Sequence, residues 1–159
     1  MSDSLIDDYA ELHALLERIA ERTSDACTEA EVAELAITHE HAVRTMGSIG
    51  LRRILDVSDR DAFRAVQATK LDEFVAQWLR IPNPRRRLRQ VTELSRLHAM
   101  TGEKLPPRCP EISDAMADGD LAHEHVDAVL DVMAKVPAAT PPEVRDLAEK
   151  QLAEIARHH

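Results

Sequence analysis

Apolar residues recur at helical spacing along the whole chain. Between residues 4 and 22 successive apolar positions are four and three residues apart in turn, at Leu5, Tyr9, Leu12, Leu16 and Ile19. No window alternates apolar and polar residues as a half-buried strand would. Only four aromatic residues and four glycines occur among 159 residues, a composition that favours helix over sheet. The sequence therefore predicts an all-α bundle of about seven or eight helices.

The first two helices are expected to form an antiparallel hairpin. Thr28 and Glu31 have the spacing of a capping box for the second helix, and the glycines at 47 and 50 predict its end. Packing the two apolar stripes against each other would bury both. A stripe of two heptads is also compatible with pairing across a homodimer, so that alternative stays open.

Later cap and break signals predict a basic unit followed by a C-terminal segment. Short helices are expected near 51–57 and 61–66, then a helix over 70–81 and an arginine-rich helix that begins at Asn83-Pro84. A loop with a glycine and two prolines over 102–107 predicts a boundary between domains 1–103 and 104–159. Helices are expected from 110, 120 and 141, and the last reaches the end of the chain without a stop signal. We expect the chain to be part of a longer protein.

Charge is distributed unevenly along the chain, whose net charge is −9. Residues 79–110 carry eight basic and two acidic side chains, between acidic segments of net charge −8 and −7. Arg85, Arg86 and Arg87 occupy the first turn of the predicted helix, where the helix dipole disfavours cations by about 0.3–1 kcal/mol each. A bound phosphate would offset this cost. Helix stability alone does not explain these arginines.

Helical projection separates the arginines into an outward and an inward group. Arg85, Arg86, Arg89 and Arg96 are the predicted nucleic-acid contacts, through phosphates. The alternative is that these four pair with carboxylates of the same chain. Arg87 projects onto the apolar side, where it needs a carboxylate partner from another helix.

The segment 70–98 has the order of a helix-turn-helix unit, with two departures from that pattern. Arg80 stands where glycine is preferred, and Arg86 stands where the second helix normally buries an apolar residue. Groove reading, pairing of these arginines with carboxylates of the same chain, and phosphate contact without sequence readout are therefore the three alternatives that stay open.

Two His-Glu-His triplets, at 39–41 and 123–125, have the composition of a metal site. Residues two apart on a helix point about 200° apart, so His39, His41, His123 and His125 are interpreted as core or boundary residues. A metal-dependent enzyme would require all four to converge. The sequence contains no phosphate-binding glycine loop, nucleophile elbow or zinc-type Cys/His spacing, so it predicts no enzyme activity, cofactor or metal.

The two cysteines and the N-terminus bear on localisation. Cys27 and Cys109 form neither a disulfide framework nor a zinc knuckle. The acidic start of the chain has no basic n-region, and no apolar run is long enough to cross a membrane. These features predict a cytoplasmic protein with reduced thiols and no membrane partner.

Several short motifs in order resemble a known family over about half the chain. They are Trp78-Leu79, the arginine run 85–89, Leu105-Pro106, the Asp-Gly-Asp-Leu at 118–121, Glu124-His125, Val136-Pro137 and Thr140-Pro141. Their order and spacing are similar to the helical domain of unknown function that precedes HNH endonuclease modules in actinobacterial and mycobacteriophage repeat proteins. The resemblance implies a mobile-element or DNA-processing setting. No residues here match the HNH module itself, so nuclease activity is not implied.

Two functions are consistent with these observations. The first is a non-catalytic, DNA-associated targeting or regulatory module of an HNH-nuclease-type protein, contacting phosphates through the basic helix. The second is a protein-interaction or self-assembly module without nucleic-acid binding, favoured by the apolar stripe of the first helix and by the acidic segments that repel DNA.

Overall fold

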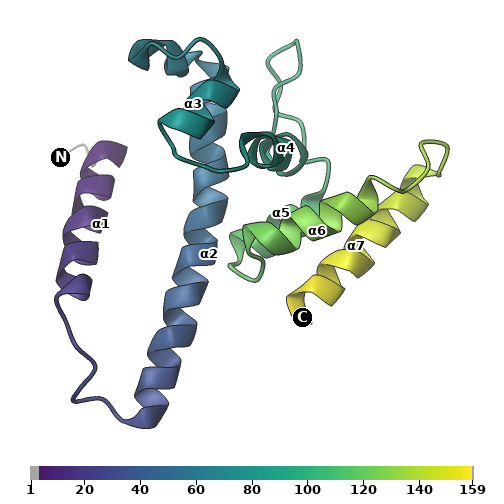
Figure 1. Cartoon of the computed structure of the whole chain (residues 1–159). Coiled ribbons are helices and arrows are strands. Elements are labelled where there is room, and N and C mark those ends of the chain that lie inside the picture. The colour runs from purple at the N-terminus through teal and green to yellow at the C-terminus, as the bar shows by residue number, and fades with distance from the viewer. Residues whose placement is uncertain (1–3, 159) are drawn as a thin grey trace. The chain divides into compact units, whose positions relative to one another are not determined.

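A computed structural model describes residues 4–158, and it confirms an all-α fold (Figure 1). Its helices are α1 (Leu5–Ala20), α2 (Glu29–Asp59), α3 (Leu71–Gln77), α4 (Pro84–Leu94), α5 (Pro110–Ala117), α6 (His123–Met133) and α7 (Pro142–His158), with a 3₁₀ turn η1 (Ala62–Val66). Within the described residues, none of these helices is both long enough and apolar enough to cross a membrane.

The chain divides into two compact units, residues 1–38 and 39–159. One apolar core runs through the second unit and draws on α2 to α7. Its fully buried members are Val75, Ile112, Ala115, Met116, Leu121 and Val126, with Cys109 among them. The boundary expected near residue 103 lies inside this unit, because helices on both sides of it share the core.

Both helices of the first unit begin at side-chain caps, of which the sequence predicted the one at Thr28. The Ser4 hydroxyl accepts the Asp7 N–H at 3.2 Å, and the Thr28 hydroxyl accepts the Glu31 N–H at 3.3 Å. In return, the Glu31 carboxylate accepts the Thr28 N–H at 2.7 Å, which completes a capping box. These caps define the starts of α1 and α2.

The mutual burial expected for the first two helices is not found. No residue of α1 is buried, and every residue from 13 to 43 is exposed. Capping and apolar spacing are local properties, whereas burial depends on a partner surface that the described residues do not provide. Tyr9 and Leu12 are half-buried, and the other positions of the two stripes are exposed.

The expected end of α2 at its glycines is wrong, because this helix spans 31 residues in all and ends only at Asp59. A Cβ atom at Gly47 would lie 2.9 Å from His123 Nε2, so this glycine allows the side chain of α6 to approach the backbone of α2. Burial of Leu51 and Ile54 in the core stabilises the helix beyond the glycines. The short helix expected near 51–57 is therefore the last part of α2, and the one expected near 61–66 is the 3₁₀ turn η1.

The turn between α3 and α4 has the conformation that the sequence pattern indicated. Arg80 adopts a left-handed conformation with φ of 54° at the position where glycine is preferred. Pro84 is the first residue of α4, as expected from its fixed φ and missing N–H. This turn directs the arginine-rich helix back across the core.

Glu149 joins two of the C-terminal helices through a buried carboxylate. This side chain of α7 accepts the Ile112 N–H at 3.0 Å and so caps the first turn of α5. Burial raises the pKa of Glu149, and the hydrogen bonds from α5 oppose that effect.

The two glycines of α2 provide a matched pair for testing the packing of α6. Gly50→Ala should stabilise the protein by about 0.5–1 kcal/mol, because open space surrounds that position and alanine is the better helix former. Gly47→Ala should destabilise it by about 1–2 kcal/mol, because the new methyl group displaces His123. Urea unfolding of both variants measures this difference. Equal stabilisation by the two substitutions would contradict the close approach.

Candidate functional site at the arginine-rich helix

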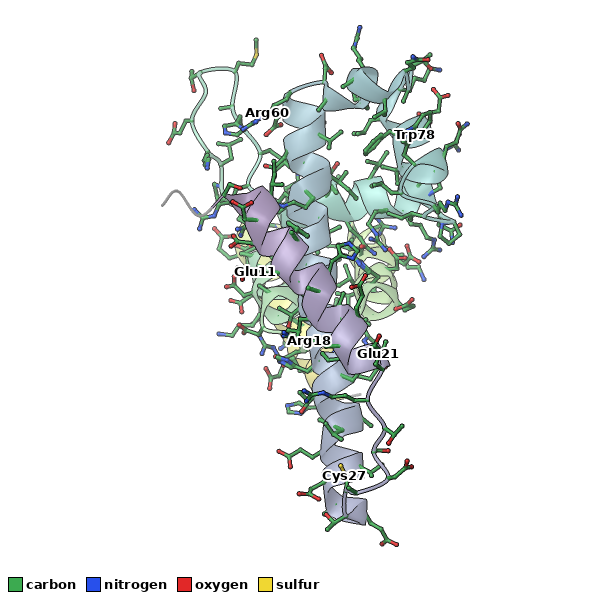
Figure 2. All side chains as sticks on the ribbon, turned by 90° about the vertical axis from the view of Figure 1, so that its left-hand side faces the viewer. Glu11, Arg18, Glu21, Cys27, Arg60 and Trp78 are labelled. Carbon is green, nitrogen blue, oxygen red and sulfur yellow. The ribbon has the colours of Figure 1, made fainter. Side chains whose placement is uncertain are left out.

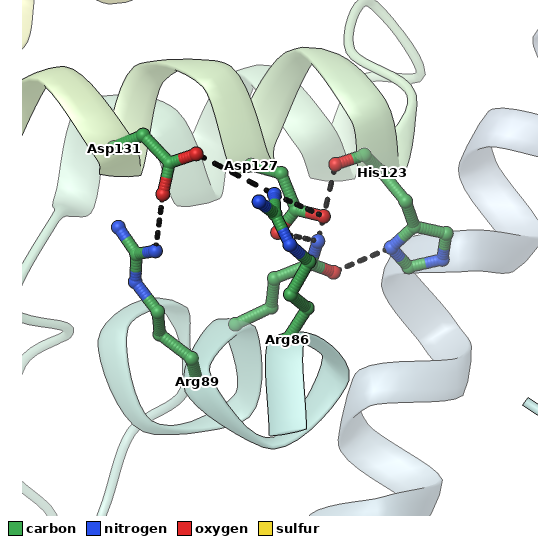
Figure 3. A network of polar contacts seen from close by, with 6 residues as sticks. Arg86, Arg89, His123, Asp127 and Asp131 are labelled. Atoms are coloured by element: carbon green, nitrogen blue, oxygen red, sulfur yellow. Dashed lines mark hydrogen bonds and ion pairs between the residues drawn. The ribbon is translucent and has the colours of Figure 1, made fainter. Parts of the chain in front are cut away.

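Helix α4 is held in the second unit by its apolar and amide side chains. Val91 and Leu94 are buried in the core, Leu88 packs against it, and Gln90 is 1% exposed. This arrangement directs Arg86 and Arg89 toward α6 (Figure 3).

Two of the four predicted contact arginines are paired with carboxylates of α6. Arg89 Nη1 donates to Asp131 Oδ1 at 2.5 Å, and Arg86 Nη1 lies 3.4 Å from Asp131 Oδ2 and 3.5 Å from Asp127 Oδ2 (Figure 3). The hydrogen bond from Arg89 and the charge of Arg86 hold the pKa of Asp131 below its ordinary value. For Arg86 and Arg89 the structure therefore supports the alternative of pairing within the chain.

Gln90 is the buried centre of this network. Its Nε2 donates to Asp127 Oδ1 at 2.8 Å and to the His123 carbonyl oxygen at 3.1 Å. Its Oε1 then accepts from His123 Nδ1 at 2.6 Å, which places the imidazole proton on Nδ1 (Figure 3). The amide thus satisfies three polar groups between α4 and α6. Gln90 was not predicted as a site residue. The only sign of its inward position in the sequence was its spacing of four residues from Leu94.

His123 is neutral at neutral pH in this environment. Burial, followed by the nearby charge of Arg87, lowers the pKa of His123 to about 4. The neutral imidazole fits the network because Gln90 Oε1 accepts one hydrogen bond from its Nδ1–H.

Arg87 faces inward but does not have the predicted direct carboxylate partner. Among residues 4–158 it makes no ion pair or hydrogen bond with a carboxylate, because Arg86 and Gln90 engage Asp127. Burial lowers the pKa of Arg87, and the charges of Asp127 and Glu124 act in the opposite direction. Carboxylates of α6 therefore compensate its charge only at longer range.

Arg85 and Arg96 remain exposed, and neither has an ion pair among the described residues. Arg96 lies at the edge of a groove of about 640 Å³ between α2, α5 and the loop after α4. The ionisable residues that line this groove are Arg52, Asp56, Asp59, Arg96, His98, Lys104 and Asp114. With both signs present, the groove is not a uniform anion site.

The four histidines of the two triplets do not converge. His41 Nε2 lies 2.8 Å from the Asp118 carbonyl oxygen, His125 Nδ1 accepts the Ala122 N–H at 3.2 Å, and His123 bonds Gln90. Within the part of the chain that the structure describes, no three potential metal ligands are grouped. These three side chains complete turns and helix contacts.

This geometry limits what α4 can do chemically. The face that carries Arg86, Arg89 and Gln90 lies against α6, so it cannot enter a major groove while the core is intact. Of the four predicted contacts, Arg85 and Arg96 are the two that are exposed without an ion pair among the described residues. Arg86 is also exposed but pairs with Asp127 and Asp131.

Comparison with known proteins finds relatives without assigned functions. The chain is 26% identical over 159 residues to the uncharacterized proteins MT1160 and Rv1128c of Mycobacterium tuberculosis, covering 99% of this chain and 38% and 35% of those proteins. It is 27% identical over 146 residues to the uncharacterized protein Mb1179c of Mycobacterium bovis, covering 91% of this chain and 32% of that protein. No family model matches the chain, and neither does any solved structure.

These relatives are mycobacterial, in agreement with the actinobacterial relationship expected from the sequence. The chain spans between about a third and two fifths of the length of the curated relatives it matches. The similarity therefore concerns a segment of larger proteins.

The depressed pKa of His123 predicts a loss of stability in acid. The unfolded chain binds a proton at this residue near pH 6.5 and the folded chain only near pH 4, so stability is fully present above pH 6.5 and falls as the pH drops toward 4. This residue should contribute a loss of about 2–3 kcal/mol between pH 7.5 and 4.5. Urea unfolding at both pH values should show a smaller loss for His123→Asn than for the wild type.

His13→Asn is the matched control, because His13 is exposed on α1 and lies outside the network. Its pH dependence should equal that of the wild type. If His123→Asn and His13→Asn show the same pH dependence of stability, the conclusion that His123 is buried in its neutral form is refuted.

Proposed function

We propose that this chain is a non-catalytic protein-interaction module whose docking element is the N-terminal pair of helices. The observation that supports the proposal is the uninterrupted exposure of residues 13–43, a span that includes Leu16 and Ile19 of the α1 stripe and the stripe positions of the first part of α2. Leu5 is exposed as well, whereas Tyr9 and Leu12 are half-buried. We call this stripe the docking surface: Leu5, Leu12, Leu16 and Ile19 of α1 with Val32 and Leu35 of α2.

The exposed apolar area is larger than single surface residues would explain. Leu16 and Leu35 are 52% and 53% exposed, although they occupy the inward positions of amphipathic helices. Apolar patches of this kind on soluble proteins mark binding surfaces, since each buried CH₂ group contributes about 0.8 kcal/mol. Residues 39–159 have a core of their own, and none of the stripe residues belongs to it.

The proposal includes a place in a larger protein. The mycobacterial relatives are two to three times as long as this chain, and the motif order resembles the helical domain that accompanies HNH modules. We infer a targeting or regulatory role beside another domain, in the reducing cytoplasm. In support of that setting, Cys27 and Cys109 are both free, and burial raises the pKa of Cys109 to about 12, which keeps it a thiol.

Two leucines of the same helix test whether the stripe serves binding or folding. Leu35→Ala should change the free energy of unfolding by less than about 0.5 kcal/mol, because Leu35 is exposed. Leu51→Ala should cost about 2–5 kcal/mol, because Leu51 is 4% exposed in the core. Enhancement of the fluorescence of the apolar dye ANS should fall in Leu35→Ala. The proposal fails if Leu35→Ala is as costly as Leu51→Ala.

DNA contact is a second candidate, favoured by the two exposed arginines that have no carboxylate partner. Arg85 lies in the first turn of α4 and Arg96 just beyond its end, so both reach solvent at the most basic segment of the chain. Because Arg86 and Arg89 are already paired, about two phosphates would be neutralised. Binding of this kind would be weak and independent of sequence.

Fluorescence anisotropy on a labelled DNA duplex tests this candidate. The logarithm of the binding constant should fall against the logarithm of salt concentration with a slope of about −2, because about two counterions are released. Arg85→Glu with Arg96→Glu should abolish binding, whereas Arg86→Gln should leave the slope unchanged. An absence of binding at 50 mM salt removes the candidate.

A further inference from the structure

The charges around the docking surface are almost all negative. Residues 4–38 carry nine acidic and two basic side chains, a net charge of −7. Among the acidic residues, Asp7 and Glu31 are engaged in the helix caps. The remaining seven are Asp8, Glu11, Glu17, Glu21, Asp25, Glu29 and Glu34.

Three of these carboxylates, Asp8, Glu11 and Glu17, lie on α1 with the apolar stripe. Projected at about 100° per residue, Asp8 lies about 60° from the centre of the stripe, and Glu11 and Glu17 lie about 120° from it on opposite sides. Arg18, the one arginine of α1, projects further away, at about 140°. Figure 2 shows Glu11 and Arg18 along α1 and Glu21 at its end. Asp8 is therefore the carboxylate at the edge of the stripe, and Glu11 and Glu17 make the polar face of α1 acidic.

The stripe is about 21 Å long from Leu5 to Ile19, at about 1.5 Å per residue. A partner helix of two heptads, with apolar residues at alternating intervals of three and four, matches that length. Side chains that flank the seam of paired helices select the partner by charge.

We infer that the docking surface binds a basic amphipathic helix of another protein segment, with leucine-like residues on one face and lysine or arginine beside them. This inference rests on the proposed function and adds the chemistry of the partner. A second copy of the chain is disfavoured because it would bring together two surfaces that each carry a net charge of −7. A basic helix would instead place cations beside Asp8 and would be attracted by the net negative charge of residues 4–38.

The test uses the full chain and a fluorescein-labelled peptide of 18 residues, with leucine at both seam positions of each heptad and lysine beside them. Fluorescence anisotropy should show saturable binding that weakens by about fivefold to tenfold between 50 and 500 mM salt. The matched peptide, in which glutamate replaces every lysine, should bind at least about tenfold more weakly.

Protein variants separate this surface from general attraction to an acidic protein. Leu12→Gln with Leu16→Gln, and separately Glu11→Lys with Glu17→Lys, should each weaken binding of the lysine peptide about tenfold or more. Glu143→Lys, at an exposed position of α7 in the other unit, should leave binding within about twofold.

Three results would overturn the inference: equal binding of both peptides, an unchanged affinity in the two N-terminal double variants, or a dimer by light scattering at concentrations where the lysine peptide does not bind. The dimer would assign the surface to a second copy and leave the proposed interaction function standing. A large stability loss in Leu35→Ala would instead remove the proposed function itself.

Discussion

The buried amide of Gln90 is the interaction on which the arrangement of α4 and α6 depends. It is 1% exposed and bonded to the ring and carbonyl of His123 and to the carboxylate of Asp127. In the low dielectric of a protein interior such a network is stable only when every member is satisfied. This requirement fixes His123 as the neutral Nδ1–H tautomer, and that ring lies against Gly47 of α2. One amide thus links three helices.

The same network explains why an arginine-rich first turn is tolerated. Cations at a helix N-terminus are unfavourable by themselves, but Asp127 and Asp131 stand one turn apart on α6 and face Arg86 and Arg89. The charge island of the sequence is therefore partly neutralised by the acidic segment that follows it. Long-range pairing of this kind leaves a basic surface much smaller than the count of arginines indicates.

Local features of the fold could be predicted from the sequence, and features set by distant residues could not. The capping boxes at Ser4 and Thr28, the start of α4 at Pro84 and the strained turn at Arg80 depend on neighbours in the chain. The continuation of α2 past Gly47 depends on the burial of Leu51 and Ile54 in a core built by distant helices, which no local signal reports. For the candidate site, the sequence identified the arginines but not their carboxylate partners or Gln90, because helix projection does not show which helix covers which face.

The two units of the chain have different physical characters. The second buries apolar faces in its own core, whereas the first leaves most of its stripe positions exposed and carries a net charge of −7 over residues 4–38. A helix without buried residues gains little stability from packing, so α1 is expected to open locally more easily than the core helices. Ordering on a partner would supply the burial that the chain itself lacks.

Amide hydrogen exchange of the full chain, resolved by residue, tests this division most directly. The account predicts that amides of α1 and of residues 29–38 exchange at least about 100-fold faster than those between Val126 and Met133 in α6, because only α6 is protected by a core. Protection of α1 equal to that of α6 would show that the N-terminal stripe is already buried, and would contradict the proposal that it is a docking surface.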